Sequence, residues 1–316
     1  MPWTRPTRAR ILIRALVTTV VVATACTPKV DPEAQYRPTE SVLEAIAVLR
    51  LHIDDDTYRY PAARDFTGKN IFLASLTRLE RLEQIHEEKL RSGYLLAPTV
   101  FAKGRALERL GEHEVAALHY QRVTSFKSAL RASARESQEI CELLAISRRA
   151  APKLDAEPEA AIRVFESRTE TLDERLVDSE GSHYWFVIQE EVERIDAERA
   201  RYFGLRAQLE PELSKIALSQ YQRLIKRHSE SKNHNRHLLD LADLYAGLAR
   251  TYIDRFPPTS LDYDPATFDE QVFGATRLYE TVSNQDGSIE KIEAARKLEA
   301  FLAFVLRIQN EKLPRS

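Results

Sequence analysis

The side chains of this sequence that could do chemistry are first of all its histidines and cysteines. Three histidines, His228, His234 and His237, lie close together and could bind a metal ion. Zinc sites usually combine Cys or carboxylate ligands at tight spacing, so we interpret this polar stretch as a solvated connection between helices. The thiol of Cys141 could act as a nucleophile, but no histidine lies near it in the sequence to activate it. A free Cys within a helical pattern is typical of a buried core residue.

Other arrangements that would support catalysis are incomplete. Glu83 and His86 have the Glu-x-x-His spacing of helical di-iron sites, yet such a site needs a second copy on another helix. The other match, Glu180 and His183, falls at a helix break because Gly and Ser separate the two residues. The nine glycines form neither a phosphate-binding loop nor a nucleophile elbow. No Ser, Cys or carboxylate pair stands in the sequence context of a catalytic site. The sequence therefore predicts a protein that is not an enzyme and holds no metal and no cofactor.

The segment 54–70 is the candidate binding site least typical of a regular helix, because acids and bases alternate there with aromatic rings. Its candidate partner-binding residues are Asp54, Asp55, Asp56, Tyr58 and Arg64. These side chains could bind a partner protein, or a cation through hard oxygen ligands. Alternatively, the segment is a helix end, a loop and the Thr67 cap of the next helix. Both interpretations stay open at the level of sequence.

The N-terminal segment has the order of an export signal. Four arginines and no acid occur before Cys26, an apolar stretch runs from Ile11 to Val22, and the small residues Ala-Thr-Ala directly precede the cysteine. The apolar run is shorter than the ~20 residues that a membrane span needs. The cysteine after these small residues resembles the bacterial lipobox, in which the thiol is acylated and becomes the first residue of the mature protein. The resemblance implies attachment to a membrane through Cys26.

Charge and composition narrow the remaining classes. Lys and Arg total 46 and Asp and Glu total 48, and removal of the first 25 residues with their four arginines would leave 42 basic and 48 acidic side chains. An acidic chain lacks the basic footprint of a nucleic-acid-binding protein, so we expect no nucleic acid as partner. Only 9 Gly and 14 Pro interrupt a sequence rich in helix-forming residues. The sequence contains no convincing run of alternating apolar β-branched residues, so we predict no sheet.

Hydrophobic periodicity predicts ten or eleven helices joined by short turns. The clearest period is in 236–254, where large apolar residues recur at spacings of three and four. The expected ranges are about 41–52, 70–91, 97–110, 112–127, 129–148, 157–175, 183–209, 211–228, 236–254, 267–283 and 287–309. Short connections favour antiparallel neighbours. The sequence therefore predicts an all-α fold.

Three of these helices share one pattern, an Ala followed four residues later by Tyr and three residues further by an aliphatic residue. The three copies are Ala116–Tyr120–Val123, Ala217–Tyr221–Leu224 and Ala275–Tyr279–Val282. A small residue lets a neighbouring helix approach, and the ring one turn later fills the space beside it. The pattern indicates close packing between helix pairs.

This pattern resembles the second helix of a tetratricopeptide repeat. The first copy also has a matching first helix, because Val100, Gly104 and Leu107 follow the large, small, large order of that family. The resemblance implies repeats at about 96–128 and 211–283, and an α-solenoid of stacked antiparallel helix pairs. Solenoids of this family typically bind peptides or proteins, so the resemblance implies a protein partner.

A lipid-anchored cysteine followed by such repeats is similar to the repeat lipoproteins of Gram-negative outer membranes. That likeness implies a periplasm-facing scaffold that binds other envelope proteins. A helical lipoprotein that binds cell-wall glycan or a small molecule is the alternative. The expected organisation is a signal peptide at 1–25, a Pro-rich tether at 26–39, a helical domain at 40–210 and C-terminal repeats at 211–316. Thr27 follows the cysteine where inner-membrane retention signals often have Asp, so we expect the outer membrane.

Overall fold

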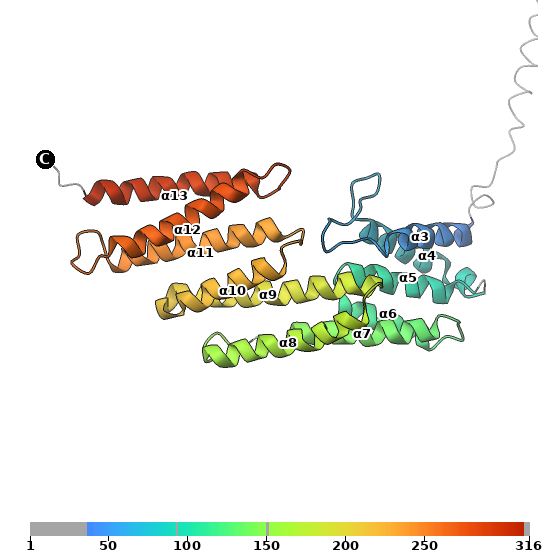
Figure 1. Ribbon diagram of the computed structural model, residues 1–316. Helices are drawn as coiled ribbons and strands as arrows, with labels where there is room; N and C mark the ends of the chain where they lie inside the picture. Colours follow the sequence, from blue (N-terminus) through green and yellow to red (C-terminus); the bar gives the residue numbers. More distant parts are fainter. Residues whose placement is uncertain (1–36, 93, 150–151, 313–316) are drawn as a thin grey trace, which may run out of the picture.

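The computed structural model describes residues 37–92, 94–149 and 152–312, which form eleven α-helices, one short 3-10 helix and no β-strand (Figure 1). The elements are α3 Pro38–His52, α4 Ile71–Ser92, α5 Leu96–Arg109, α6 His113–Thr124, α7 Arg131–Arg149, α8 Pro158–Asp178, α9 His183–Leu209, η1 Pro211–Leu213, α10 Ser214–Arg227, α11 His234–Arg255, α12 Pro265–Ser283 and α13 Lys291–Lys312. The predicted all-α class is confirmed. Within this part of the chain, no helix has the length and apolarity to span a bilayer. Cys26 and the expected signal peptide lie outside the described residues.

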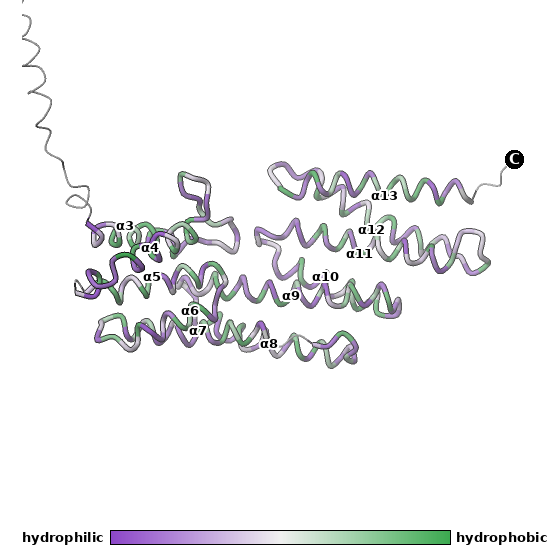
Figure 2. The backbone as a smooth tube through the Cα atoms, turned by 180° about the vertical axis from the view of Figure 1, so that it is seen from behind, coloured by the Kyte–Doolittle hydropathy of each residue, from purple (hydrophilic) through white to green (hydrophobic). Residues whose placement is uncertain are grey.

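Each helix packs against the next one in the chain, and the antiparallel pairs stack into a solenoid (Figure 1). Figure 2 shows hydrophilic and hydrophobic residues alternating along the helices, as helices with one buried face require. Three clusters of buried apolar side chains follow one another along the stack, in α3–α7, α7–α11 and α11–α13. Because neighbouring clusters share a helix, the core continues through the whole stack.

The residues that carry the repeat pattern lie in the seams between paired helices. All twelve are buried: Val100, Gly104, Leu107, Ala116, Tyr120, Val123, Ala217, Tyr221, Leu224, Ala275, Tyr279 and Val282. In the first seam, a Cβ placed on Gly104 would lie 2.8 Å from Cε1 of Tyr120, so α5 and α6 approach closely only because position 104 has no side chain. Gly204 in α9 faces Tyr221 of α10 in the same way, at 3.2 Å. This second glycine belongs to the pattern, although the sequence analysis did not include it.

Helix α9 lies between the first and second halves of the stack. It has 27 residues, and in Figure 1 it runs from beside α5 to beneath α10 and α11. Its buried residues contribute to one apolar cluster together with α7, α8, α10 and α11. The expected domain boundary between residues 210 and 211 falls inside this cluster, where helices on both sides bury the same side chains.

The connection between α3 and α4, residues 53–70, crosses to the loop between α10 and α11, and we call it the strap (Figure 1). The amide of Lys232 donates to the carbonyl of Tyr58 at 3.0 Å, far along the chain. Its flanking helices begin at other residues than expected. Pro38 starts α3, so the expected tether loses its last two residues to this helix, and Asn70 rather than Thr67 caps α4 by accepting from the amide of Phe72.

Candidate functional site

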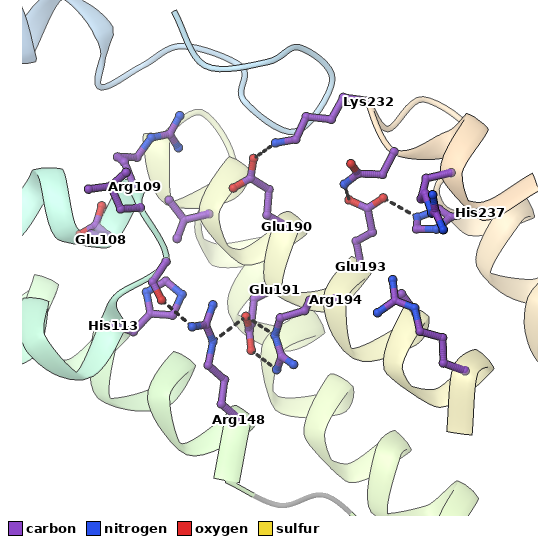
Figure 3. Close-up of a pocket in the computed structure, with 17 residues that line it drawn as sticks. Glu108, Arg109, His113, Arg148, Glu190, Glu191, Glu193, Arg194, Lys232 and His237 are labelled. Atoms are coloured by element: carbon purple, nitrogen blue, oxygen red, sulfur yellow. Dashed lines mark hydrogen bonds and ion pairs between the residues drawn. The ribbon is translucent and has the colours of Figure 1, made fainter. Parts of the chain in front are cut away.

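A cavity of about 400 Å³ lies where α5, α7, α9 and α11 approach one another (Figure 3). The turn after α5 forms one side, and Arg148 enters from the last turn of α7. Helix α9 supplies the wall from Val187 to Arg201, and the segment from Lys232 to His237 closes the opposite side. Four separate helix pairs therefore contribute to one site.

The strap borders this cavity at its upper edge in Figure 3. The guanidinium of Arg109 donates to the carbonyl of Asp55 at 2.7 Å, and the ammonium of Lys232 donates to the carbonyl of Thr57. Lys232 also donates to the carboxylate of Glu190 at 2.6 Å. Both basic side chains are thus held by backbone carbonyls of the strap.

The side chains that reach the cavity surface are mostly cationic. Five retain substantial exposure of the side chain: Arg201 57%, Arg236 41%, Arg148 40%, Arg194 35% and Lys232 28%. Of the lining carboxylates, Glu190 is 30% exposed, whereas the other three, Glu108, Glu191 and Glu193, are at most 4% exposed. The lining residues include no Phe, Tyr or Trp side chain. The cavity therefore presents cations on its surface and keeps most of its acids beneath.

The buried acids are ionised counter-ions of the surrounding side chains. Burial alone would raise the pKa of Glu191, but hydrogen bonds from Arg194 and Ser147 and the charge of Arg148 outweigh it and lower this pKa. Ser147 and Arg194 each lie 2.6 Å from a Glu191 oxygen, and Arg148 lies at 3.3 Å. A carboxylate held charged in this way positions the arginines and is not suited to donate a proton.

Glu108 is a second buried acid, and it connects four helices. Its carboxylate accepts from the hydroxyl of Tyr120 at 2.8 Å and from Nε2 of His183 at 2.7 Å. Arg105 lies beside it and donates to the hydroxyl of Tyr184, which in turn donates to Ser137 in α7. Burial opposes ionisation, but the charge of Arg105 and the bond from His183 dominate and lower the pKa of Glu108 to about 2.

Two further carboxylates on α9 each pair with a histidine from the α10–α11 region. Asp196 lies 3.1 Å from Nε2 of His228, whose Nδ1 lies 2.8 Å from the hydroxyl of Tyr58 in the strap. One turn earlier, Glu193 lies 2.7 Å from Nε2 of His237. Both acids are buried, and hydrogen bonds from these histidines outweigh the effect of burial and lower the pKa of each carboxylate. We call Glu108, Glu191, Glu193 and Asp196, with their partners, the ionic hub.

Two basic side chains next to the cavity are buried without full hydrogen bonding. Arg109 is 9% exposed, and its Nε and Nη1 atoms have no hydrogen-bond partner. Its guanidinium lies over the ring of Phe72 at 5.3 Å. Burial lowers its pKa, and the charges of Glu190 and Glu108 oppose that shift. Nδ1 of His113 also has no partner, and burial followed by the charge of Arg148 lowers the pKa of this imidazole to about 4.

The structure distributes the residues of segment 54–70 over two environments. Tyr58 is buried, its ring lying edge-on to Trp185 with centroids 6.1 Å apart, so its side chain makes contacts within the chain. Asp55 and Asp56 are partly buried, and Asp56 pairs with Arg59. Asp54 and Arg64 are exposed. Only these last two therefore remain on the open surface.

The interpretation of the histidines as a solvated loop is wrong for two of the three. His228 and His237 are 0% and 3% exposed and bind carboxylates of α9, which lie far away in the sequence. The physical reason is that α11 and the loop before it pack onto α9, a contact that the polar sequence around them does not indicate. The prediction for Cys141 is confirmed, since its thiol is fully buried and burial raises its pKa.

Within the described residues, no group of three or more His, Cys, Asp or Glu side chains has the arrangement of a metal site. Glu83, the acid of the Glu-x-x-His pair, instead forms ion pairs with Lys103 and Arg122, both at 2.8 Å. Comparison of the chain with protein-family models and with curated proteins gave no match. The site is therefore interpreted from its own geometry.

Proposed function

We propose that this chain is a lipid-anchored protein of the bacterial envelope whose helical solenoid binds another envelope protein. The N-terminal sequence supports the anchor, because Cys26 follows a basic head, an apolar run and small residues. A single acyl chain gives marginal binding, so a firm anchor needs several chains on this cysteine. Thr27 favours the outer membrane, and the resemblance to repeat lipoproteins favours a body that faces the periplasm.

The observation that carries the docking function is the cavity on the solenoid. It is built by four helix pairs, it is lined by side chains with exposed N–H donors, and its lining includes no Phe, Tyr or Trp ring on which a sugar could stack. An open, charged surface of this kind suits the polar groups of a protein segment better than an enclosed small molecule. The glycine–tyrosine seams of α5–α6 and α9–α10 agree with a tetratricopeptide-like scaffold.

The buried acids speak against an enzyme. A general acid at neutral pH needs a carboxyl group whose pKa is raised. The pKa values of Glu108, Glu191, Glu193 and Asp196 are all lowered, because arginines and histidines surround them. These groups organise the scaffold, and the proposal assigns no catalytic residue.

Substitution of the anchor cysteine tests the proposal directly. We expect Cys26→Ala, expressed in a Gram-negative host, to lose incorporation of labelled palmitate and to move from the membrane fraction to the soluble fraction. Cys141→Ala is the matched control, because it removes a thiol that is buried in α7; this variant should stay with the membrane. A Cys26→Ala protein that still sediments with membranes would contradict the lipid anchor.

The docking part is tested by crosslinking in intact cells, followed by purification from detergent-solubilised envelopes. We expect a defined envelope protein to crosslink to a photoreactive residue at Arg201, at the cavity, and not to one at Arg78 in α4. Equal crosslinking at both positions, or none at Arg201, would contradict docking at the cavity.

A further inference from the structure

The cavity holds more basic than acidic groups at positions that a ligand can reach. Five half-exposed cations surround it, whereas Glu190 is the one carboxylate of its lining with comparable exposure. The chain as a whole has the opposite balance, since its 48 acidic side chains outnumber its 46 basic ones. A local excess of accessible positive charge is what recognises an anionic ligand.

The buried acids of the lining already accept hydrogen bonds from side chains of this chain. Glu191 accepts from Ser147, Arg148 and Arg194, and Glu193 accepts from His237 and Asn233. Each of the exposed arginines nevertheless keeps N–H groups beyond those it donates within the chain, because a guanidinium has five. Among these arginines, Arg201 makes the fewest polar contacts within the chain, namely one ion pair with Asp240 at 3.5 Å. The cavity surface can therefore still donate to a ligand.

Arg109 provides an independent argument for an anionic ligand. Its guanidinium lines the cavity, is nine-tenths buried, and leaves Nε and Nη1 without a hydrogen-bond partner. A buried cation with incomplete hydrogen bonding is costly. Negative charge brought into the cavity would stabilise it across a short, poorly screened distance.

The shape of the basic surface identifies the kind of anion. A second cavity of about 370 Å³ continues along α9 and α11 and shares Arg201 and Arg236 with the first. Asp240 and Asp243 also line the second cavity, and both are paired with basic side chains. The exposed cations are therefore spread along α9 and α11 rather than gathered at one point. A line of separated cations fits carboxylates spaced along a chain, whereas a single phosphate group would use only one position. Arginine is well suited to this role, because its planar N–H groups bind carboxylate in a bidentate manner.

We propose that the groove formed by these two cavities binds an acidic segment, rich in Glu and Asp, of the partner protein. The proposal rests on the proposed docking function and specifies the partner's chemistry. Arg148 and Arg201 bind carboxylates of the segment, Arg236 extends the contact into the second cavity, and Arg109 adds positive charge from below. Glu190 and Asp243 oppose the segment, because they are the more exposed acids of the groove lining, at 30% and 37%; Glu190 is paired with Lys232 and Asp243 with Lys297.

The test uses the full-length chain in detergent and a fluorescein-labelled oligoglutamate peptide, with anisotropy as the readout. We expect binding that weakens as salt is added and that Arg201→Gln weakens about tenfold, the loss of one charge-assisted hydrogen-bonded contact. Arg148→Gln should weaken binding similarly. Arg78→Gln is the matched control, since Arg78 is 44% exposed and pairs with one glutamate, but lies on α4 away from the groove. It should leave the affinity unchanged.

Glu190→Gln provides the sharper test, because a purely structural role of this residue could only weaken binding. We expect this variant to bind the oligoglutamate peptide severalfold more tightly, since it removes one of the opposing charges and releases Lys232. An oligolysine peptide of the same length should not bind.

Several outcomes would overturn the proposal. They are equal affinity of Arg201→Gln and Arg78→Gln, weaker binding by Glu190→Gln, or binding of inorganic phosphate in place of the peptide. Because the assay needs neither a membrane nor the cellular partner, its failure leaves the Cys26 anchor standing. Conversely, a protein without the lipid anchor would still bind the peptide.

Discussion

The seams within helix pairs and the ionic hub around α9 are both buried, yet they are built from different contacts. In the seams, Tyr120 packs on Gly104 and Tyr221 packs on Gly204, each within one pair of neighbouring helices. In the hub, His183 binds Glu108 from 75 residues away, and Tyr58 binds His228 from 170 residues away. The seams are local and apolar, and the hub is non-local and charged.

The difference between these contacts indicates how the helix pairs of the solenoid are held relative to one another. A seam fixes the geometry within a pair, since a small residue and a ring are complementary in shape. The hub connects pairs that are not neighbours, through charges that lose much stability when one partner is missing. We therefore expect the seams to set the shape of each unit and the hub to set how the units stand around the cavity.

The largest predicted effect is on the hub. Asp196 contacts Arg199, Arg227 and His228 and is 1% exposed, so Asp196→Ala leaves Arg199 and His228 without their carboxylate and removes one of the two carboxylates that Arg227 contacts. We expect a loss of about 3–5 kcal/mol in the free energy of unfolding, measured by urea denaturation.

The control is the acid that shares one of these partners. Asp173 also pairs with Arg227, but its side chain is 41% exposed. Asp173→Ala should cost at most about 1 kcal/mol. Similar losses for the two variants would show that burial of the hub charges does not distinguish the hub from surface ion pairs.

The second prediction concerns pH and compares two histidines on α6. His113 faces the cavity and the pKa of its imidazole is lowered to about 4, chiefly by burial. The unfolded chain takes up this proton below about pH 6.5 and the folded chain does not. The stability from His113 is therefore complete above pH 6.5 and is lost as the pH falls toward 4, by about 2 kcal/mol between pH 6.5 and 5. His113→Gln should flatten the pH dependence of urea unfolding over this interval.

His119 sharpens this comparison, because it lies on the side of α6 near Lys103 and Glu83. Burial also lowers its pKa to about 4, but the residue is less buried than His113. Solvent screening should reduce its contribution, so His119→Gln should flatten the pH profile less. The opposite order would place the pH-sensitive group near Lys103 and Glu83 instead of at the cavity.

The same contrast explains what could be predicted from the sequence. The helices and the seam residues follow from a period of 3.6 and from the Ala–Tyr pattern, because their contacts lie within a short stretch of chain. The hub could not be predicted in this way. Glu108 and Asp196 are charged residues in charged helices, and their partners come from segments that only the stacked fold brings together. Among the buried residues of α9, charged side chains stand between Ile188, Val192 and Ile195. Charged residues at the helical spacing of the buried apolar residues of α9 are the sequence signal that could indicate the hub.

The smallest predicted effect separates the two seams from each other. Ala is more favourable than Gly inside a helix by about 1 kcal/mol, but a Cβ on Gly104 would meet the Tyr120 ring at 2.8 Å, and the hydroxyl of that ring is held by Glu108. Because this ring is tied to the hub, it yields poorly, and Gly104→Ala should lower the free energy of unfolding by about 1 kcal/mol. The contact at Gly204 is 3.2 Å, and Gly204→Ala should be close to neutral.

Adding Tyr120→Phe should reduce the cost of Gly104→Ala in a double-mutant cycle, because the ring is then released from Glu108. An unchanged cost would mean that packing alone holds the ring, and that the hydrogen bond from Tyr120 to Glu108 does not couple the α5–α6 seam to the hub.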